Sequence, residues 1–594
     1  MCRIAGIISN QLPPDELREK VGIMCNALRH GGPDDGGIYT NDDERLCFGH
    51  RRLSIIDLSA NGHQPMADID KKAWISFNGE IYNYLDLKEQ LLKAGARFHS
   101  NTDTEVILLA YLYWGNACFN KLQGMFAFAL YDIEKEITYL VRDSSGIKPL
   151  YYCTANNSLS FASETKALKL AGIATQPNEN WQVRFLAYGY IPEPYTALRN
   201  VFNLPKGHFL CWDNRTGSHI INCYVVQPAL NTIVNEREAK EYIHNSLKQA
   251  VSRQLMADAP LGVFLSGGID SSILTLLAAQ NQRDLKTISI FFDEKAYDER
   301  AYQNLVADKI TGEKFAHLVK QRDFNNHLSQ IIGDMDMPTT DGINSWFISK
   351  YAHEDGLKAV LSGVGADELF GGYPSFNRIK HINLLRKLPI ALLNAARYFK
   401  KDKYKKIAYL AHNHYLADYL LLRGLFTPDD IAKILNTDTV QVEHILFNEA
   451  NNYPVKKYNK DQASWFETNL YMQNQLLRDT DVMSMSHGLE VRVPFLDEKF
   501  IQAVQSISPA IRFDNHQPKK LLIDSFTDML PAAIWNRPKM GFTFPLQQWM
   551  KQHPEISNED VYKNIAAKNI IKKFKNNELH WSKAFTLYQL QLHG

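Results

Sequence analysis

A turn rich in glycine and serine follows an apolar run in the stretch LGVFLSGGIDSS. The apolar run ends at Leu265, and a helix is predicted to begin near Asp270. Because glycine lacks a Cβ atom, the backbone N–H groups of Gly267 and Gly268 can approach an anion at the positive end of the helix dipole. The hydroxyl groups that can add donors are those of Ser266, Ser271 and Ser272. An ordinary tight turn would not explain three hydroxyls and a carboxylate, so the pattern predicts a phosphate-binding loop.

A second glycine-rich turn, in AVLSGVGADELFGG, carries the adjacent acids Asp367 and Glu368. It also follows an apolar run, and the carboxyl ends of parallel strands meet at one edge of a sheet. We therefore expect Asp270 and Asp367 to lie together and to hold Mg²⁺, because this ion prefers oxygen ligands. The alternative is that these acids only cap helices.

The third candidate for chemistry is Cys2, which directly follows the initiator methionine. Removal of that methionine would expose a cysteine with a free α-amine. An α-amino group titrates at roughly 7.7–8.0, low enough to accept the thiol proton, directly or through water, near neutral pH. Cys2 is therefore predicted to be a nucleophile with its own α-amine as base. By itself a cysteine at this position is a weak signal, so the prediction depends on the residues that accompany it.

Two parts of the chain with different sequence patterns are predicted to position these residues. Residues 1–210 alternate short β-rich runs such as KAWISFNGEIYN with turn clusters such as RHGGPDDGG, which predicts an α+β sandwich of stacked antiparallel sheets with a few helices. From about residue 236, helical spacing alternates with buried strands that end in glycine, which predicts a doubly wound parallel α/β sheet. We expect an N-terminal domain over 1–213, a linker over 214–236, and an α/β domain with a helical C-terminal part over 237–594.

The composition is that of an ordinary globular protein. Its 594 residues include 66 lysine and arginine against 65 aspartate and glutamate, so the formal net charge is +1. This balance gives no field that attracts a polyanion or an anionic membrane, and we expect no nucleic acid and no membrane as partner. No apolar run reaches the roughly 18–20 residues that span a bilayer, and the N-terminus lacks the layout of a secretion signal. A cytoplasmic location is therefore expected.

Cysteine usage and the C-terminal apolar stretches bear on the class of protein. The seven cysteines all lie in the first 223 residues and show no CxxC spacing, which argues against a disulfide framework or a zinc site.

Beyond about residue 375, the stretches HINLLRKLPIALLNAARYF and DYLLLRGLF have helical periodicity. Because they are too short to span a bilayer, we predict core helices. The basic segment NIAAKNIIKKFKNN is predicted to form a solvated amphipathic helix.

The loop SGGIDSS resembles the SGGxDS loop of the ATP pyrophosphatases, which cleave ATP to AMP and pyrophosphate. No GxxxxGKS or GxxxxGKT pattern occurs at this site, so transfer of the γ-phosphate is not favoured. The resemblance implies ATP and Mg²⁺ as cofactors. It places at the nucleotide Ser266, Gly267, Gly268, Asp270, Ser271 and Ser272, and it places against the adenine and ribose Phe264, Ile290, Ser362 and Gly363.

At the N-terminus, Cys2 is followed in order by RHGGPDDGG, GHRRLSIID, FNGEIYN and SNTDTE. This set resembles the N-terminal-nucleophile glutamine amidotransferases, the class II glutaminases. By that resemblance Asn78 and Gly79 form the oxyanion hole, where fixed donors face the charge that develops on the attacked amide. The other glutamine-binding residues that it implies are Arg52 at the α-carboxylate, Asp103 at the α-ammonium and Glu80 in the pocket wall.

The order of motifs along the whole chain is similar to that of the glutamine-hydrolysing asparagine synthetase family. Besides the two motif sets above, the chain carries LEVRVPFLD at 489–497 and RPKMGF at 537–542, and the resemblance covers about residues 1–550. It implies that the first domain releases ammonia, that a channel carries it inward, and that the second domain activates a carboxylate as an acyl-adenylate. A dry passage would protect both ammonia and the adenylate from water. Lys539 would stabilise charge that develops at the adenylate and on pyrophosphate.

Three positions depart from the pattern of this family. Its usual SGEGxDE reads SGVGADE, and Val364 can neither move a proton nor carry charge, so the acceptor and the amide-forming step are left open. RHRGPD reads RHGGPD, and Gly31 is expected to loosen glutamine recognition. DRMSM reads DVMSM, with Val482 in a helix expected near the acceptor, where loss of an arginine would change which carboxylate is accepted.

Three hypotheses for the function therefore remain. The first is an ammonia-transferring amide synthetase, with aspartate as the default acceptor and a natural-product, sugar or cell-wall carboxylate as the rival. The second is a ring-closing synthetase of the β-lactam type, which the retained glutaminase residues disfavour. The third is a catalytically dead scaffold, which Val364 permits and the retained residues of the nucleotide site disfavour. Glutamine and the acceptor are the expected partners, and a homodimer is the assembly to test.

Overall fold

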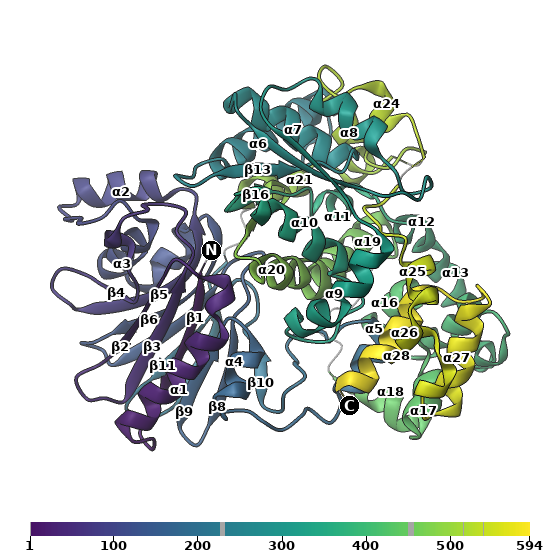
Figure 1. The fold of residues 1–594 in the computed structure, drawn as a ribbon, viewed down its shortest axis with the longest axis horizontal. Coiled ribbons are helices and arrows are strands. Elements are labelled where there is room, and N and C mark those ends of the chain that lie inside the picture. The colour runs from purple at the N-terminus through teal and green to yellow at the C-terminus, as the bar shows by residue number, and fades with distance from the viewer. Residues whose placement is uncertain are drawn as a thin grey trace.

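The computed structural model describes residues 2–225, 232–449, 455, 457–514, 516–538 and 540–593. Its N-terminal part contains two antiparallel six-stranded sheets, in the orders β10-β8-β9-β1-β3-β2 and β12-β11-β7-β6-β5-β4 (Figure 1). The strands of the first sheet are β1 (Arg3–Ile8), β2 (Asp35–Thr40), β3 (Leu46–Arg52), β8 (Tyr151–Ala155), β9 (Ser158–Ala162) and β10 (Val201–Asn203). Those of the second are β4 (Met66–Ala67), β5 (Ala73–Ile81), β6 (Gly124–Asp132), β7 (Ile137–Arg142), β11 (His208–Asp213) and β12 (His219–Cys223).

Apolar side chains of the two sheets meet in one buried cluster. Ile4 and Phe48 come from the first sheet, and Leu140 and Trp212 come from the second. The helices that pack on the outer face of the first sheet are α1 (Pro14–Ala27), α4 (Thr165–Leu170) and α5 (Trp181–Tyr188). Those on the second are α2 (Tyr84–Lys93) and α3 (Asp103–Trp114). The predicted sandwich of stacked antiparallel sheets is confirmed.

The second sheet continues into the range that the sequence predicted to be a linker. Strand β12 pairs with β11, with His208 opposite Cys223, so paired structure extends beyond residue 213. Residues 226–231 lie outside the described residues, and helix α6 begins at Glu236. The domain boundaries themselves stay a prediction.

The C-terminal part is built on a parallel five-stranded sheet in the order β15-β14-β13-β16-β17. Its strands are β13 (Leu261–Phe264), β14 (Lys286–Phe291), β15 (Lys314–Leu318), β16 (Ala359–Leu361) and β17 (Glu490–Arg492). One face packs against α6 (Glu236–Gln254), α7 (Ile269–Asn281), α21 (Glu498–Ser506) and α23 (Lys520–Asp524). The other packs against α9 (Gln321–Asp334), α10 (Ile343–Glu354) and α20 (Arg478–Met485). Helices on both faces confirm the predicted α/β class.

The register of this sheet brings the two glycine-rich turns together. Strand β13 lies next to β16, with Val263 opposite Leu361. Both strands then end within a few residues, so the turns SGGI and SGVG leave the same edge at neighbouring positions. On the far side of β16, Leu361 lies opposite Arg492 of β17. The sheet therefore places side by side the SGGIDSS turn, the SGVGADE turn and the LEVRVPFLD motif.

The remaining helices form most of the C-terminal third and the periphery of the parallel sheet (Figure 1). They are α8 (Arg300–Ala307), α11 (Ala366–Phe370), α12 (Ser375–Arg378), α13 (Lys380–Leu385), α14 (Ile390–Ala395), α15 (Asp402–Lys405), α16 (Tyr415–Arg423), α17 (Pro428–Leu435), α18 (Thr439–Phe447), α19 (Lys460–Phe466), α22 (Pro509–Arg512), α24 (Ala532–Trp535), α25 (Leu546–Gln552), α26 (Pro554–Ser557), α27 (Ile565–Lys575) and α28 (Trp581–His593). Helix α27 is amphipathic with lysines in its last turn, as predicted. Among the described residues, no helix is both long and apolar enough to cross a bilayer.

The two apolar stretches predicted to be core helices differ in burial. In DYLLLRGLF, helix α16 buries Tyr419 and Leu420, as predicted. In HINLLRKLPIALLNAARYF, however, Leu384, Ile390 and Leu392 are 68%, 63% and 58% exposed. The prediction of core helices therefore holds for Ile382 and Leu393, which are buried, and fails for these three residues. Periodicity shows which residues share a face but not whether another element covers that face.

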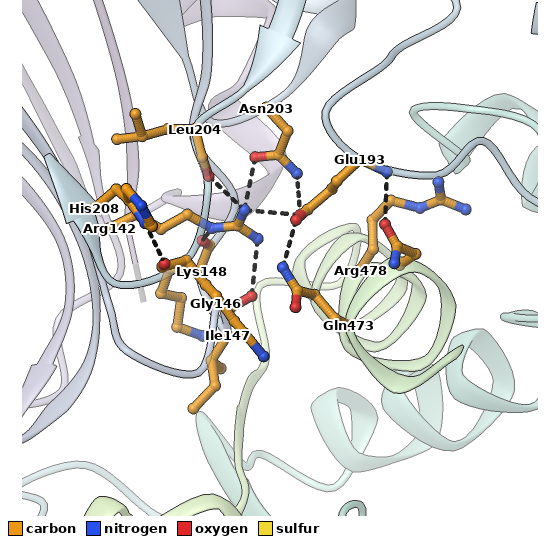
Figure 2. A network of polar contacts seen from close by, with 12 residues as sticks. Arg142, Gly146, Ile147, Lys148, Glu193, Asn203, Leu204, His208, Gln473 and Arg478 are labelled. Carbon is orange, nitrogen blue, oxygen red and sulfur yellow. Dashed lines mark hydrogen bonds and ion pairs between the residues drawn. The ribbon is translucent and has the colours of Figure 1, made fainter. Parts of the chain in front are cut away.

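Buried polar contacts join the two parts of the molecule around Arg142, at the end of β7 (Figure 2). Nη1 of Arg142 lies 2.7 Å from Oε1 of Glu193, and Gln473 also donates to the Glu193 carboxylate. Gln473 belongs to a π-helical segment, Glu467–Leu477, that leads directly into α20. Segments of π-helix are rare and occur mostly at functional sites. The contact therefore ties the N-terminal part to a helix of the C-terminal part.

Candidate active sites

Cys2 directly precedes β1 and is buried, with 8% of its surface exposed. Its backbone N–H donates to Oδ1 of Asn78 at 3.2 Å. Its Sγ lies 4.0 Å from the carbonyl oxygen of Leu53, the residue after β3. Burial raises the pKa of the Cys2 thiol to about 11. The thiol is therefore neutral at pH 7 and needs a base before it can act as a nucleophile.

Asn78 and Gly79 lie on β5, beside Cys2. While Oδ1 of Asn78 accepts from Cys2, its buried Nδ2 has no hydrogen-bond partner among the described residues. Leaving a buried donor unpaired is costly, which favours a ligand oxygen at this place. Gly79 has φ +155°, and a Cβ there would lie 2.1 Å from the carbonyl oxygen of Met125. The structure thus brings the two residues predicted for the oxyanion hole to the predicted nucleophile.

Arg52 ends β3 and lies buried one residue before Leu53. Its Nη1 donates to the carbonyl oxygen of Ser59 at 2.8 Å, and its Nη2 donates to that of Asp57 at 2.5 Å. A Cβ at Gly62 would lie 1.9 Å from Nη2 of Arg52. Glycine is therefore required at that position for the guanidinium to keep its place near Cys2.

Two buried carboxylates, Asp103 and Glu80, lie near the end of β5. Oδ2 of Asp103 accepts from the backbone N–H of Ile81 at 2.9 Å. Burial raises the pKa of Asp103 to about 6, and burial together with the nearby Glu490 raises the pKa of Glu80. Nη2 of Arg492 lies 3.5 Å from Oε1 of Glu80, although Arg492 belongs to the C-terminal sheet. The predicted glutamine pocket is therefore completed by the other half of the chain.

Sequence reasoning missed Glu490 and Arg492 as neighbours of this pocket. Both are fully buried on β17, and Nε of Arg492 lies 2.5 Å from Oε1 of Glu490. Nη1 of Arg492 donates to the carbonyl oxygens of Gln254 and Met256 at 2.8 and 2.6 Å. Residues two apart on a strand share one face. The alternation of charged and apolar residues in LEVRVPF was therefore a signal that could have found the pair.

Arg3, the residue after the predicted nucleophile, is fully buried at the boundary between the halves. Its Nη1 lies 2.7 Å from Oδ2 of Asp481, and its Nε lies 2.8 Å from Oε1 of Glu164. A Cβ at Gly31 would lie 2.8 Å from Cγ of Arg3. Gly31 therefore makes room for the Arg3 side chain. Because Asp481 directly precedes Val482 on α20, the ion pair reaches the helix that carries the third departure from the family pattern.

The turn after β13 has the geometry that its glycines predict. Gly267 has φ +81°, a conformation that favours glycine. Oγ of Ser272 donates to the carbonyl oxygen of Gly268 at 2.6 Å, so this serine shapes the turn. A Cβ at Gly363 would lie 2.9 Å from Cβ of Asp270. The two glycine-rich turns are therefore in direct contact.

Asp270 and Asp367 converge on Lys519, which is 4% exposed. Nζ of Lys519 lies 2.6 Å from Oδ2 of Asp270 and 2.5 Å from Oδ1 of Asp367. Burial opposes the charge of Lys519, but the two carboxylates raise its pKa above the usual value. Two carboxylates on one buried cation form an oxygen-only donor set that also suits Mg²⁺. Sequence reasoning missed Lys519, because PKKLLI signals only the start of a helix.

A cavity of about 530 Å³ lies at this edge of the sheet, within the usual size of ligand sites. The predicted residues that line it are Phe264, Ser266, Gly268, Asp270, Ser271, Ser362, Gly363 and Asp367. Gly267, Ser272 and Ile290 are not in its described lining. Ile290 is buried in the core, and Ile288 of the same strand lines the cavity. The structure thus brings most of the predicted nucleotide residues together around one space.

Val364 lines this cavity together with Asp341, Glu368 and Asp479. Burial, with a neighbouring carboxylate in each case, raises the pKa of Asp341 and of Glu368 to about 7. Carboxyl groups that titrate near neutral pH therefore share the cavity wall with the valine. Val482 is buried on α20 and is not in the described lining.

Arg537 holds the RPKMGF segment against the nucleotide turn. Its Nη2 donates to the carbonyl oxygen of Gly267 at 2.9 Å and lies 2.7 Å from Oε1 of Glu299. The residues Pro538 and Met540 line the cavity. Lys539, the predicted catalytic lysine, lies outside the described residues. Its two neighbours nevertheless place this part of the motif at the predicted site.

Family models match both halves of the chain. The model described as asparagine synthase matches residues 243–573, and the model described as glutamine amidotransferase domain matches residues 1–224. Each match contains the motifs of one of the two sites.

Curated relatives match most of the chain. Glutamine-hydrolysing asparagine synthetase 1 of Bacillus subtilis is 30% identical over 93% of this chain and 88% of its own. A putative glutamine-hydrolysing asparagine synthetase 2 of Methanocaldococcus jannaschii is 33% identical over 75% of this chain and 89% of its own. The protein named amidase chry2 of Gibberella zeae is 26% identical over 90% of this chain and 86% of its own. With one matched domain in each half and relatives that cover most of its length, this chain belongs to the asparagine synthase family, the ATP-dependent ligases that hydrolyse glutamine.

Proposed function

We propose that this enzyme hydrolyses glutamine at Cys2, passes the ammonia inward, and uses it to amidate a carboxylate that ATP has activated as an acyl-adenylate. The observation that carries the proposal is that one chain holds both sites. Cys2, with its buried thiol, donates to Asn78, whose Nδ2 has no hydrogen-bond partner among the described residues, and Asp270 and Asp367 line a cavity at the nucleotide turn.

In the glutaminase step, the mature chain would begin with Cys2. The thiol proton passes to the α-amine as Sγ attacks the side-chain amide carbon of glutamine. Nδ2 of Asn78 and the backbone N–H of Gly79 hold the oxyanion. Arg52 and Asp103 bind the α-carboxylate and the α-ammonium. Ammonia leaves with the transferred proton, and water then hydrolyses the thioester to give glutamate.

In the synthetase step, an oxygen of the acceptor carboxylate attacks the α-phosphorus of ATP, and pyrophosphate leaves. Ammonia then attacks the acyl carbon, and AMP leaves with the bonding electrons. The backbone of the SGGIDSS turn and Lys519 bind the phosphates, and Lys539 is assigned to the charge on pyrophosphate. Asp270 and Asp367 would hold Mg²⁺, which neutralises phosphate charge when it is bound. We place the reaction in the cytoplasm, where seven unpaired cysteines stay reduced.

Aspartate is the default acceptor in this proposal, and a specialised carboxylate is the second candidate. The observation that favours the second candidate is Val364, which stands in the cavity wall where the family pattern has a glutamate. In either case a base must take a proton from the attacking ammonia. Asp341 and Glu368 line the same cavity with pKa values of about 7, so we assign this role to one of these two groups.

The test measures the two half-reactions separately. Wild type and Cys2→Ala are assayed for glutamate release, and for AMP release against a panel of carboxylic acids with glutamine or ammonium as nitrogen donor. We expect Cys2→Ala to lose glutamate release while it keeps AMP release with ammonium. Absence of glutamate release by wild type would contradict the amidotransferase proposal, and absence of AMP with every acid would contradict the synthetase proposal. Mass spectrometry of the mature chain shows whether it begins with Cys2.

A further inference from the structure

Helices α13 to α15 and their connections expose an unusual set of large apolar side chains. Ile382 and Leu393 anchor the segment by packing into the core. The exposed members are Leu384 (68%), Leu388 (41%), Ile390 (63%), Leu392 (58%), Tyr398 (84%), Phe399 (51%) and Tyr404 (45%). Single exposed apolar residues need no explanation, but seven of them lie within residues 384–404. Large exposed apolar patches mark interaction sites. We call residues 380–406 the basic apolar patch.

The same residues concentrate positive charge. Residues 380–406 contain nine lysine and arginine residues and one acid, Asp402, whereas the whole chain has a net charge of only +1. The overall balance, from which we expect no membrane partner, therefore does not describe this segment. Asp402 is paired with Lys583 at 2.6 Å. The exposed lysines of the patch are Lys380, Lys387, Lys400, Lys401 and Lys403. None of them forms an ion pair with any residue that the structure describes, so their charges face outward.

The inward side of the patch is fixed by a different set of contacts. Arg386 pairs with Asp418, and Arg397 lies 3.5 Å from Glu443. Lys405 lies 3.6 Å from Asp430. Arg386, Arg397 and Lys405 are thus paired with acids of the body, while the exposed lysines are not. The patch is therefore a firmly held surface and not a loose tail.

We propose that the basic apolar patch docks this enzyme on the surface of an anionic lipid bilayer. Leu384, Ile390 and Leu392 would enter the boundary between headgroups and acyl chains, as the apolar face of an interfacial helix does. Tyr398 and Tyr404 suit the headgroup level, where aromatic rings with a polar tip are enriched. The exposed lysines of the same segment would contact anionic headgroups.

Two other partners fit the patch less well. A second copy of this chain would place one lysine-rich face against another in a two-fold interface, and like charges repel there. Nucleic acid is bound mainly through phosphate contacts and base stacking, and exposed leucine and isoleucine contribute to neither. Aliphatic side chains combined with unpaired lysines favour a surface that is both apolar and anionic.

The patch is far from the glutamine pocket and close in sequence to the nucleotide cavity. Helix α13 lies at the end of the molecule opposite the N-terminal sheets (Figure 1). Tyr373 lines the cavity, and Lys380 begins the patch seven residues later. Docking would therefore leave the glutaminase half free of the lipid surface. The proposal does not depend on which carboxylate the enzyme accepts.

The test is sedimentation of the full-length enzyme with vesicles. Vesicles of equal parts phosphatidylglycerol and phosphatidylcholine are compared with vesicles of phosphatidylcholine alone, at low and high salt. We expect at least tenfold stronger partition to the anionic vesicles at low salt, and a large loss at high salt. Equal partition to both kinds of vesicle, or none to either, would overturn the proposal.

Substitutions inside and outside the patch then distinguish docking through the patch from nonspecific adsorption to vesicles. We expect partition to anionic vesicles to fall at least tenfold in the double variant Ile390→Glu with Leu392→Glu. The same loss is expected in the triple variant Lys400→Glu with Lys401→Glu and Lys403→Glu. The matched controls are Val440→Glu, at a residue 68% exposed outside the patch, and Lys572→Glu with Lys573→Glu on α27, which should change partition less than twofold. Circular dichroism, thermal melting and glutaminase activity should match wild type in every variant.

Two further outcomes would assign the patch to another partner and refute lipid docking. In the first, light scattering shows that wild type is a dimer and that the double variant Ile390→Glu with Leu392→Glu is a monomer, while wild type does not bind anionic vesicles. The other is binding of a DNA or RNA oligonucleotide that the lysine variant abolishes while wild type again ignores the vesicles. Loss of glutamine hydrolysis by wild type would bear on the proposed reaction and not on the docking surface.

Discussion

In the proposed glutaminase reaction, much depends on one side-chain amide. Oδ1 of Asn78 accepts from the backbone N–H of Cys2, and its buried Nδ2 has no hydrogen-bond partner within the described part of the chain. Such an arrangement costs stability in the free protein, and an oxyanion bound at Nδ2 would offset that cost. Asp103 is a second residue of this kind, because burial holds its pKa near 6 and makes its charge depend on pH.

We predict that Asn78→Ala lowers kcat for glutamine hydrolysis by about 10²–10³-fold, because one donor to the oxyanion is removed. KM for glutamine should change little, since the donor acts mainly in the transition state. Steady-state assays of glutamate release measure this, with the exposed Asn10→Ala as control. A fall of less than threefold would contradict the role of Asn78.

We also predict a pH dependence of kcat/KM for glutamine. Asp103 must be ionised to bind the ammonium of glutamine, and its pKa is raised to about 6. Ionisation of Asp103 is complete well above this pH and is lost below it. Below pH 6 Asp103 should therefore add about a tenfold fall in kcat/KM per pH unit to the fall that protonation of the Cys2 α-amine already causes below about pH 8. Asp103→Asn should have a low kcat/KM that lacks this additional fall. A wild-type profile that is no steeper below pH 6 than between pH 6 and 7 would exclude the assignment.

At the scale of elements, glycines allow strands and turns to approach closely enough to form the sites. The turns after β13 and β16 touch at Gly363 and Asp270, and Gly31 leaves the space that Arg3 fills. Neither of these close contacts can be predicted from the sequence of one element by itself. Each depends on a partner that lies far away in the sequence.

We predict that Gly363→Ala impairs the synthetase half alone. The new Cβ would lie 2.9 Å from Cβ of Asp270, so the nucleotide turn must shift. AMP formation should fall at least tenfold, because misplacing a positioned group by a fraction of an ångström removes most of its effect. Glutamate release should stay within twofold of wild type. Gly22→Ala, where nothing lies within 4 Å, is the control and should leave both activities unchanged.

A double substitution tests the contact between Arg3 and Gly31. Arg3→Gly leaves the buried Asp481 and Glu164 without this cation and should cost about 3–5 kcal/mol of stability. Gly31→Arg should also destabilise, because its side chain meets Arg3. The double variant should recover at least half of the summed loss in thermal or denaturant unfolding. Simple additivity of the two losses would show that the positions do not share one space.

On the scale of the whole molecule, the two sites form one unit because charged groups of each half are buried against the other. Arg492 reaches Glu80, and Arg3 reaches Asp481 on α20. The Arg142–Glu193 pair reaches the π-helical segment before α20 (Figure 2). At the same scale, charge is uneven, since a nearly neutral chain carries a strongly basic segment at 380–406.

We predict that Glu193→Gln uncouples the two reactions. It removes the charge that Arg142 faces and weakens the hold on the π-helical segment. Glutamate release should exceed AMP formation, so that the ratio of the two products rises from about one to at least about two. Asp132→Asn, at a carboxylate paired with Lys135 inside the N-terminal half, is the control and should leave the ratio unchanged. An unchanged ratio in Glu193→Gln would place the coupling elsewhere.

The sequence by itself determined the classes of fold and predicted the chemistry. Alternation of apolar and polar residues predicts the antiparallel sheets, and strands that end in SGG and SGVG predict the edge where Asp270 and Asp367 meet. These signals are local, since each depends only on spacing along one strand or turn. The ordered motifs around Cys2 likewise predicted which residues surround the nucleophile.

Only the tertiary structure decided which residues complete each site and which surfaces stay open. Lys519 reaches the carboxylates from about 150 residues beyond Asp367, and Arg492 reaches Glu80 from the other half of the chain. No local sequence pattern predicts such partners, because side-chain contacts between residues far apart in the sequence depend on how the sheets and helices pack. For the same reason, periodicity in HINLLRKLPIALLNAARYF predicted helices correctly but not that their apolar face would remain exposed.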